Sequence, residues 1–317
     1  MLIQGMRKRG KTGLSWERTV DRALVHRDAI AEVLLTDIVQ LDETSFEVAA
    51  QWSRSHRVYR PDRDGRHDPM LLLETVRQAG LALSHHGFGV PFESKSVMHD
   101  VGFRLEPEVE PRAIRSATNV TVSVECENVV LRGDQLRSMT VMLAMSADGT
   151  HFATGSGSLS WLPERTFDAL RARNGARPTA DDPAAAVLGS VATPAASRYR
   201  ALSDALLVAE DPLPDRRRVL IPIDHPVYFD HPLDHAPGML LIDAAWQAAS
   251  ATRPDERLRL VECSMKCPAF TELFGEAWVF LKPITTGQID FWIEQSGRTT
   301  AMGELHFRRA VAAAAVS

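Results

Sequence analysis

Two helix-length apolar segments mark the chain, and each is followed by runs of alternating apolar and polar residues. Residues 70–83 (MLLLETVRQAGLAL) and 239–250 (MLLIDAAWQAAS) are apolar on nearly every side, which predicts helices that are buried over most of their surface. The alternation after them is typical of strands with one buried face. The alternating runs are 119–131, 138–146 and 151–161 in the first half and 257–265, 276–283, 288–295 and 300–309 in the second. The pattern predicts an α+β protein in which a long buried helix with an antiparallel sheet occurs twice.

The two apolar segments belong to an internal duplication. Residues 56–80 align without gaps with residues 225–249 and share eight identities, among them His56 with His225, where chance gives roughly one or two. In this alignment Glu74 occupies the same position as Asp243. A carboxylate at one position of two apolar helices is the first place to look for chemistry.

Composition divides the chain between the two copies. Residues 171–198 are rich in Ala, Pro, Gly and Asp and have little hydrophobic periodicity, as is typical of a linker. The expected organisation is an N-terminal tail (1–21), a first unit (22–165), a linker (166–198), a second unit (199–310) and a C-terminal tail (311–317).

Charge and cysteine usage narrow the class of protein. The net charge of −5 gives no reason to expect nucleic-acid binding. No stretch approaches the roughly 18 apolar residues that span a bilayer, and the N-terminus lacks the apolar centre of a signal peptide. Three cysteines, an odd number, predict reduced thiols and a cytoplasmic location. No metal site is expected.

The second copy resembles the thioester dehydratases of fatty acid synthesis, which have the hot-dog fold. The resemblance is carried by His231, by Pro237-Gly238 and by the run PGMLLIDAAWQ at 237–247, whose carboxylate is Asp243. It implies a hot-dog unit, in which a long buried helix is wrapped by an antiparallel sheet.

The whole chain resembles the A-factor biosynthesis family of γ-butyrolactone autoinducer synthases, which are tandem hot-dog proteins. Three segments carry this resemblance: VHRDAIAEVLLTD at 25–37, HDPMLLLETVRQAG at 67–80 and FDHPLDHAPGMLLIDAAWQAA at 229–249. It implies two fused units that form a pseudo-dimer. No cofactor is expected, and the oligomeric state stays open, with a homodimer as one alternative. The resemblance also implies an acyltransferase that joins a β-ketoacyl thioester, on acyl carrier protein or CoA, to dihydroxyacetone phosphate; the ester then closes to a butenolide or butyrolactone.

The helices supply the first candidate site residues. In the family a Glu is followed three residues later by an Arg; the first helix keeps this pair as Glu74 and Arg77, whereas the second has Asp243 and Trp246. Residues three apart share a helix face, so Glu74 is the expected base and Arg77 the expected clamp for an anion or phosphate. The alternative for this pair is a structural ion pair that holds the units together.

The start of the second helix supplies the next candidates. Gly238 allows a close approach to the backbone, and free N–H groups there suit a developing oxyanion. Asp243 and His231 are the remaining expected catalytic residues, with His235 as a competitor of His231. The expected substrate-binding residues are Gly238, Met239, His235, His67, Gln78 and Gln247.

Two other functions stay open at this point. Asp243, Trp246 and Gln247 favour a dehydratase or thioesterase that acts on an acyl thioester. A non-catalytic regulator that binds a butyrolactone would need a DNA-reading element, and no basic helix-turn-helix is visible. Among the remaining features, Gly155 and Gly157 predict a bulge in a strand.

Overall fold

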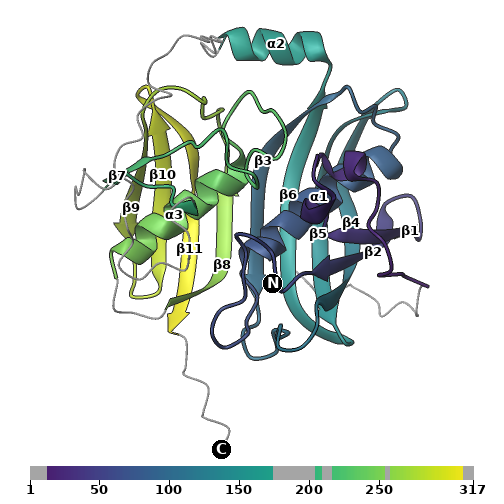
Figure 1. Ribbon diagram of the computed structural model, residues 1–317. Coiled ribbons are helices and arrows are strands. Elements are labelled where there is room, and N and C mark those ends of the chain that lie inside the picture. Colours follow the sequence, from purple (N-terminus) through teal and green to yellow (C-terminus); the bar gives the residue numbers. More distant parts are fainter. Residues whose placement is uncertain (1–12, 174–203, 209–215, 254–257, 310–317) are drawn as a thin grey trace, which may run out of the picture.

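The strands form a single continuous sheet. A computed structural model describes residues 13–173, 204–208, 216–253 and 258–309. Its 11-stranded sheet has the order β1-β2-β4-β5-β6-β3-β8-β11-β10-β9-β7 (Figure 1). The first-half elements are η1 (Arg22–Val25), η2 (Ile30–Glu32), β1 (Leu35–Gln40), β2 (Ser45–Trp52), α1 (Met70–His86), β3 (Lys95–Leu105), β4 (Thr118–Arg132), β5 (Gln135–Ala147), β6 (Thr150–Leu162) and α2 (Glu164–Arg173). The second-half elements are β7 (Arg216–Val219), α3 (Gly238–Ala251), β8 (Leu258–Lys266), β9 (Ala277–Pro283), β10 (Gln288–Gln295) and β11 (Arg298–Arg309).

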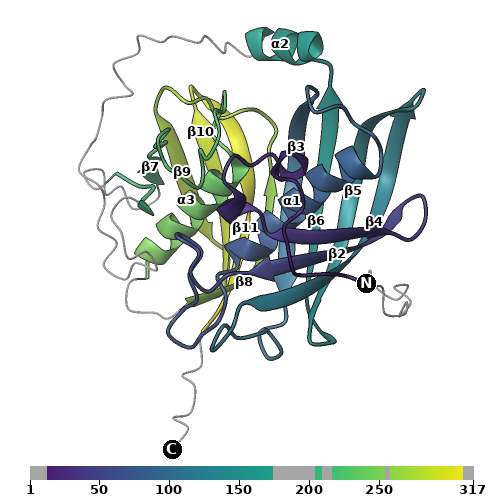
Figure 2. The ribbon, with the colours of Figure 1, turned by 45° about the vertical axis from the view of Figure 1, so that its right-hand side comes forward.

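The two halves join through one strand from each. Strand β3 pairs antiparallel with β6 of its own half and with β8 of the other, for example at Val101 and Met265. Helices α1 and α3 lie on the same face of this sheet, in front of the strands in Figures 1 and 2. The predicted pseudo-dimer of two helix-on-sheet units is therefore confirmed.

The predicted helices are confirmed and slightly extended, to 70–86 and 238–251. The predicted strands correspond to β4, β5, β6 and β8–β11 with end shifts of a few residues at most. Most α1 side chains are buried, which agrees with its all-round apolar sequence. Within the described residues, no helix combines the length and the apolar character needed to cross a bilayer.

The bulge predicted at Gly155 and Gly157 is wrong. Both residues keep regular register with β5 and β3, and the register shift on β3 falls between Met98 and Asp100. A Cβ built on Gly155 would lie 2.4 Å from Cγ2 of Val76 on α1. These glycines therefore let the helix pack closely on the strand.

Two of the predicted segments, the N-terminal tail and the linker, can be compared in part with the described residues. Residues 15 and 16, inside the expected N-terminal tail, are anchored: Ser15 N donates to Asp37 (2.9 Å) and Trp16 Nε1 to the Ala50 carbonyl (3.2 Å). Residues 166–173 of the expected linker belong to α2, and residues 174–198 lie outside the described part of the chain.

Candidate functional site

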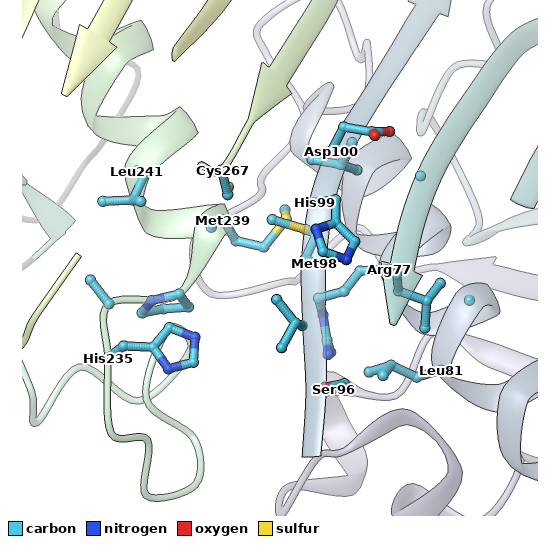
Figure 3. Close-up of a pocket in the computed structure, with 18 of the residues that line it drawn as sticks. Arg77, Leu81, Ser96, Met98, His99, Asp100, His235, Met239, Leu241 and Cys267 are labelled. Carbon is cyan, nitrogen blue, oxygen red and sulfur yellow. The ribbon is translucent and has the colours of Figure 1, made fainter. Parts of the chain in front are cut away.

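A cavity of about 330 Å³ lies between the two units (Figure 3). Its walls come mainly from α1, β3, β5 and β6 of the first unit and, in the second, from the loop before α3, the first turn of α3 and the segment that follows β8. Five predicted site residues line it: Arg77, His231, His235, Gly238 and Met239. The other five are buried and do not line it: Glu74, Asp243, His67, Gln78 and Gln247.

Arg77 presents part of its guanidinium to the cavity. Its Nε lies 2.9 Å from Oε2 of Glu74, and its Nη2 lies 2.7 Å from Oε1 of Glu74 and 3.2 Å from the Val25 carbonyl. The side chain is 20% exposed. Among the described residues no hydrogen bond reaches Nη1, so this nitrogen is available to an anionic ligand.

Glu74 is the buried centre of an ion-pair network. Besides Arg77, it accepts hydrogen bonds from Arg27 Nη2 (2.7 Å) and from Gln78 Nε2 (2.6 Å). Burial raises the pKa of this carboxyl, but the charges of the two arginines and the hydrogen bonds from Arg77 and Gln78 outweigh burial and lower its pKa to about 2. A carboxylate with so low a pKa and such occupied oxygens is a weak base; the geometry favours Glu74 as the anion that fixes both guanidiniums.

Arg27 connects the two units and was not singled out from the sequence. Besides its hydrogen bond to Glu74, its guanidinium contacts the second unit, where Nη1 donates to the Val227 carbonyl (2.8 Å) and to Asp230 (3.0 Å). The Asp230 side chain is 1% exposed. The one sequence signal for this residue is its place in the segment 25–37, which carries part of the family resemblance.

His231 forms a carboxylate–imidazole pair with Asp230. Nδ1 of the ring lies 2.7 Å from Oδ1 of Asp230. Burial raises the pKa of Asp230, but its hydrogen bond with His231 and the charge of Arg27 lower it far below the usual range, so the carboxylate is ionised. With Nδ1 donating to this carboxylate, Nε2 of a neutral His231 ring carries the lone pair. His235 repeats the motif with Asp234 at 2.6 Å.

The starts of the two helices differ in their capping residues, which stand at aligned positions of the duplication. The N–H of Met70 at the start of α1 donates to the Asp68 carboxylate (2.9 Å). Pro237 stands at the equivalent position before α3, and this helix has no side-chain cap. The first amides of α3, those of Gly238 and Met239, therefore remain open beside the cavity.

The Met98 side chain packs against this open helix start. A Cβ built on Gly238 would lie 2.2 Å from Cε of Met98, so only glycine leaves room for the thioether as it stands. Figure 3 shows Met98 between Met239 and Arg77. A methionine tip is flexible, and a ligand can displace it from the helix start.

The predicted residues outside the cavity have identifiable partners. Tyr228 donates its hydroxyl to the fully buried Asp243. Gln78 bonds the backbone at Leu34 N and Glu32 O, and Gln247 bonds that at Leu206 N and Asp204 O. This correspondence indicates that each glutamine anchors the segment that enters its unit, and it favours a structural role over the predicted substrate contact.

Two further histidines, His67 and His26, differ in their position relative to the cavity. His67 does not line the cavity. Its Nε2 lies 2.7 Å from the Thr118 hydroxyl oxygen, and burial lowers the pKa of the ring to about 4. His26 lines the cavity, and its Nε2 lies 2.8 Å from Nε2 of His85. Burial, followed by His85 and the nearby charges, lowers the pKa of His26 to about 3, so the ring is neutral. The described residues contain no cluster of three His, Cys, Asp or Glu side chains suited to a metal ion.

Comparison of the fold finds hot-dog thioesterases. An acyl-ACP thioesterase from Bacteroides thetaiotaomicron superposes with a TM-score of 0.52 at 13% identity, covering 84% of this chain and 100% of that structure. A 12:0-ACP thioesterase from Umbellularia californica also gives 0.52, at 11% identity, covering 86% and 100%. At such identities the likeness establishes the fold alone.

Comparison of the sequence finds the family. A protein of Streptomyces virginiae named 2-oxo-3-(phosphooxy)propyl 3-oxoalkanoate synthase is 33% identical over 84% of this chain and 88% of its own length. One of the same name from Streptomyces coelicolor is 30% identical over 73% of this chain and 71% of its own length. The family profile described as AfsA, the A-factor biosynthesis hotdog domain, matches residues 12–163 and 200–308. The chain belongs to the A-factor biosynthesis hotdog family.

Proposed function

We propose that this protein is a 2-oxo-3-(phosphooxy)propyl 3-oxoalkanoate synthase in the formation of a γ-butyrolactone or butenolide autoinducer. It transfers a 3-oxoacyl group from a thioester to the hydroxyl of dihydroxyacetone phosphate. The names of the relatives support the reaction. The observation that carries the proposal is the cavity, where the available Nη1 of Arg77 and the uncapped start of α3 meet between apolar walls.

The reaction needs a phosphate clamp, an oxyanion site and a base. The hydroxyl oxygen attacks the thioester carbonyl carbon, the C–S bond breaks, and the hydroxyl proton ends on the departing sulfur. Arg77 is assigned to the phosphate, because a guanidinium already held along its Nε–Nη2 edge by Glu74 keeps a fixed orientation. The amides of Gly238 and Met239 are assigned to the carbonyl oxygen as its negative charge develops.

His231 is assigned to proton transfer. Ionised Asp230 orients the ring and stabilises the imidazolium formed when Nε2 takes the hydroxyl proton. The same nitrogen then returns the proton to the sulfur. Glu74, the base expected from the sequence, has the supporting role of orienting Arg77, and Asp243 supports the fold of the second unit through Tyr228.

One chain provides one such site in this proposal. Trp246 occupies the position equivalent to Arg77 and is buried, and Asp68 caps the helix start equivalent to Gly238. Arg259, which pairs with Glu110 and donates to the His67 carbonyl (2.8 Å), fills space close to that helix start. The acyl donor is an acyl carrier protein or CoA thioester, and homodimer formation remains part of the proposal.

The product identifies the activity. Purified protein is incubated with a 3-oxoacyl thioester and dihydroxyacetone phosphate, and the mixture is analysed by mass spectrometry. We expect the phosphorylated ester together with one equivalent of free thiol. Thiol release at the same rate without dihydroxyacetone phosphate indicates a thioesterase and refutes the proposal. Loss of water from a 3-hydroxyacyl thioester, blocked by Asp243→Asn, identifies a dehydratase instead.

A further inference from the structure

The cavity continues beneath helix α1, into the space between that helix and the sheet. Val76, Gly80 and Leu81 line it from the helix, and Val141 of β5 and Leu159 of β6 line it from the strands. These side chains are apolar, in contrast to Arg77 and His231 nearer the second unit. The inner part of the cavity therefore suits a hydrocarbon chain.

Gly80 is an unusual residue for its place. It lies well inside α1, where glycine is less favourable than any residue except proline. Its backbone is not in the left-handed region. Local conformation therefore does not explain a glycine at this position.

Close packing of backbones does not explain it either. A Cβ built on Gly80 would meet only side-chain ends, 3.2 Å from Cδ2 of Leu159 and 3.7 Å from Cγ2 of Val141. At Gly102, by contrast, the added Cβ would lie 2.8 Å from the Cys263 carbonyl oxygen. Alanine at position 80 needs only a slight shift of one leucine tip, so the fold alone does not require glycine there.

The duplication provides the comparison. The equivalent residue of α3 is Ala249, which is fully buried and does not line the cavity. Glycine thus stands where helix α1 lines the cavity, whereas alanine stands at the equivalent position of α3, far from the cavity-lining residues at the start of that helix. We propose that Gly80 sets the length of the acyl chain that the enzyme accepts, because any side chain at this position presses on the Leu159 tip that lines the same cavity and so narrows the space beneath α1; this inference rests on the function proposed above.

The size of the effect follows from the space that is filled. Each methylene that is no longer buried costs roughly a factor of four in affinity. Gly80→Ala adds one methyl group at the inner part of the cavity. We expect the ratio of kcat/KM for a long acyl thioester to that for a short one to fall roughly fourfold in this variant, and on the order of tenfold or more in Gly80→Val.

The experiment measures that ratio over a series of 3-oxoacyl thioesters of increasing length, with dihydroxyacetone phosphate as acceptor. Activity on the shortest thioester shows that each variant is folded, and Gly80→Ala also removes an unfavourable helix glycine, so its thermal stability is expected to be unchanged or higher. Ala249→Gly is the matched control and is expected to lose stability without changing the chain-length preference.

Two results separate this inference from the proposed function. If the wild-type protein forms the ester but both Gly80 variants keep its chain-length profile, the assignment of Gly80 is overturned and the synthase function stands. An equal shift in Ala249→Gly also overturns it, because the effect is then not local to the cavity. If the wild-type protein forms no ester, the proposed function fails, and with it the inference that depends on it.

Discussion

Replacing Glu74 with glutamine removes the buried negative charge that holds Arg27 and Arg77 in place. The side chain is 2% exposed and accepts hydrogen bonds from both guanidiniums. Its pKa falls from the ordinary 4.5 to about 2 on folding, which corresponds to roughly 3 kcal/mol of stability at neutral pH. Removing one partner of a buried ion pair costs about 3–5 kcal/mol in other proteins, so the two arguments agree.

The contribution has a defined pH dependence. Because the pKa of Glu74 is lower in the folded protein, the stabilisation is complete above about pH 4.5 and is lost as the pH falls toward about 2. The difference in unfolding free energy between wild type and Glu74→Gln is therefore expected to be about 3 kcal/mol at pH 7 and less than half of that near pH 3.

Urea denaturation at a series of pH values measures this difference, with exposed Glu93→Gln as the matched control. A cost below about 1 kcal/mol at pH 7, or a difference that stays constant down to pH 3, refutes the network as described. Kinetics test the role of Glu74 separately. A rise in KM for dihydroxyacetone phosphate supports the role of Glu74 in orienting Arg77. A fall in kcat of about 10²-fold or more at unchanged KM instead supports Glu74 as the base that the sequence predicted.

Substitutions in three further places test the site and the fold. Arg77→Lys keeps the charge but loses the planar fork, so KM for dihydroxyacetone phosphate should rise about tenfold or more with little change in the KM of the thioester; equal effects on both substrates contradict a phosphate clamp. Gly238→Ala should lower kcat with little loss of thermal stability, because its Cβ crowds the helix start but only the flexible Met98 tip has to move; an unchanged kcat or a large fall in melting temperature contradicts this. Gly155→Ala should cost about 1–3 kcal/mol in urea denaturation and Gly157→Ala less, because their added Cβ atoms lie 2.4 and 3.3 Å from the overlying valine; the reverse order contradicts the packing argument.

The sequence predicted helices α1 and α3 and strands β4–β6 and β8–β11 well because their patterns are strong, but it did not predict the edge strands β1 and β7. It missed β2, whose burial pattern is nearly continuous, since α1 and the N-terminal segment cover both of its faces. Strand β3 was not predicted for a related reason: it lies at the centre of the joined sheet, and its pattern of exposure is irregular. A two-residue period appears only where one face is buried and the other is exposed.

The candidate site divides in a similar way. Arg77 was found because it completes the family's Glu-Arg pair on one helix face, and Gly238 because it follows Pro237 at the start of a helix that resembles the dehydratases. Arg27 and Gly80 were not, because their significance depends on what lies opposite them across an interface or beneath a helix. The glutamines illustrate the converse: Gln78 and Gln247 recur in both copies, yet the structure shows them bonded to backbone in each unit. Recurrence alone does not distinguish a contact with substrate from a shared structural need.

A crystal structure of the protein with dihydroxyacetone phosphate tests the central claim most directly. The account predicts one ligand per chain, with its phosphate at Nη1 of Arg77 and its hydroxyl directed toward the start of α3 at Gly238. A phosphate bound beside Trp246 at the Asp68-capped start of α1, or one that makes no contact with Arg77, contradicts it.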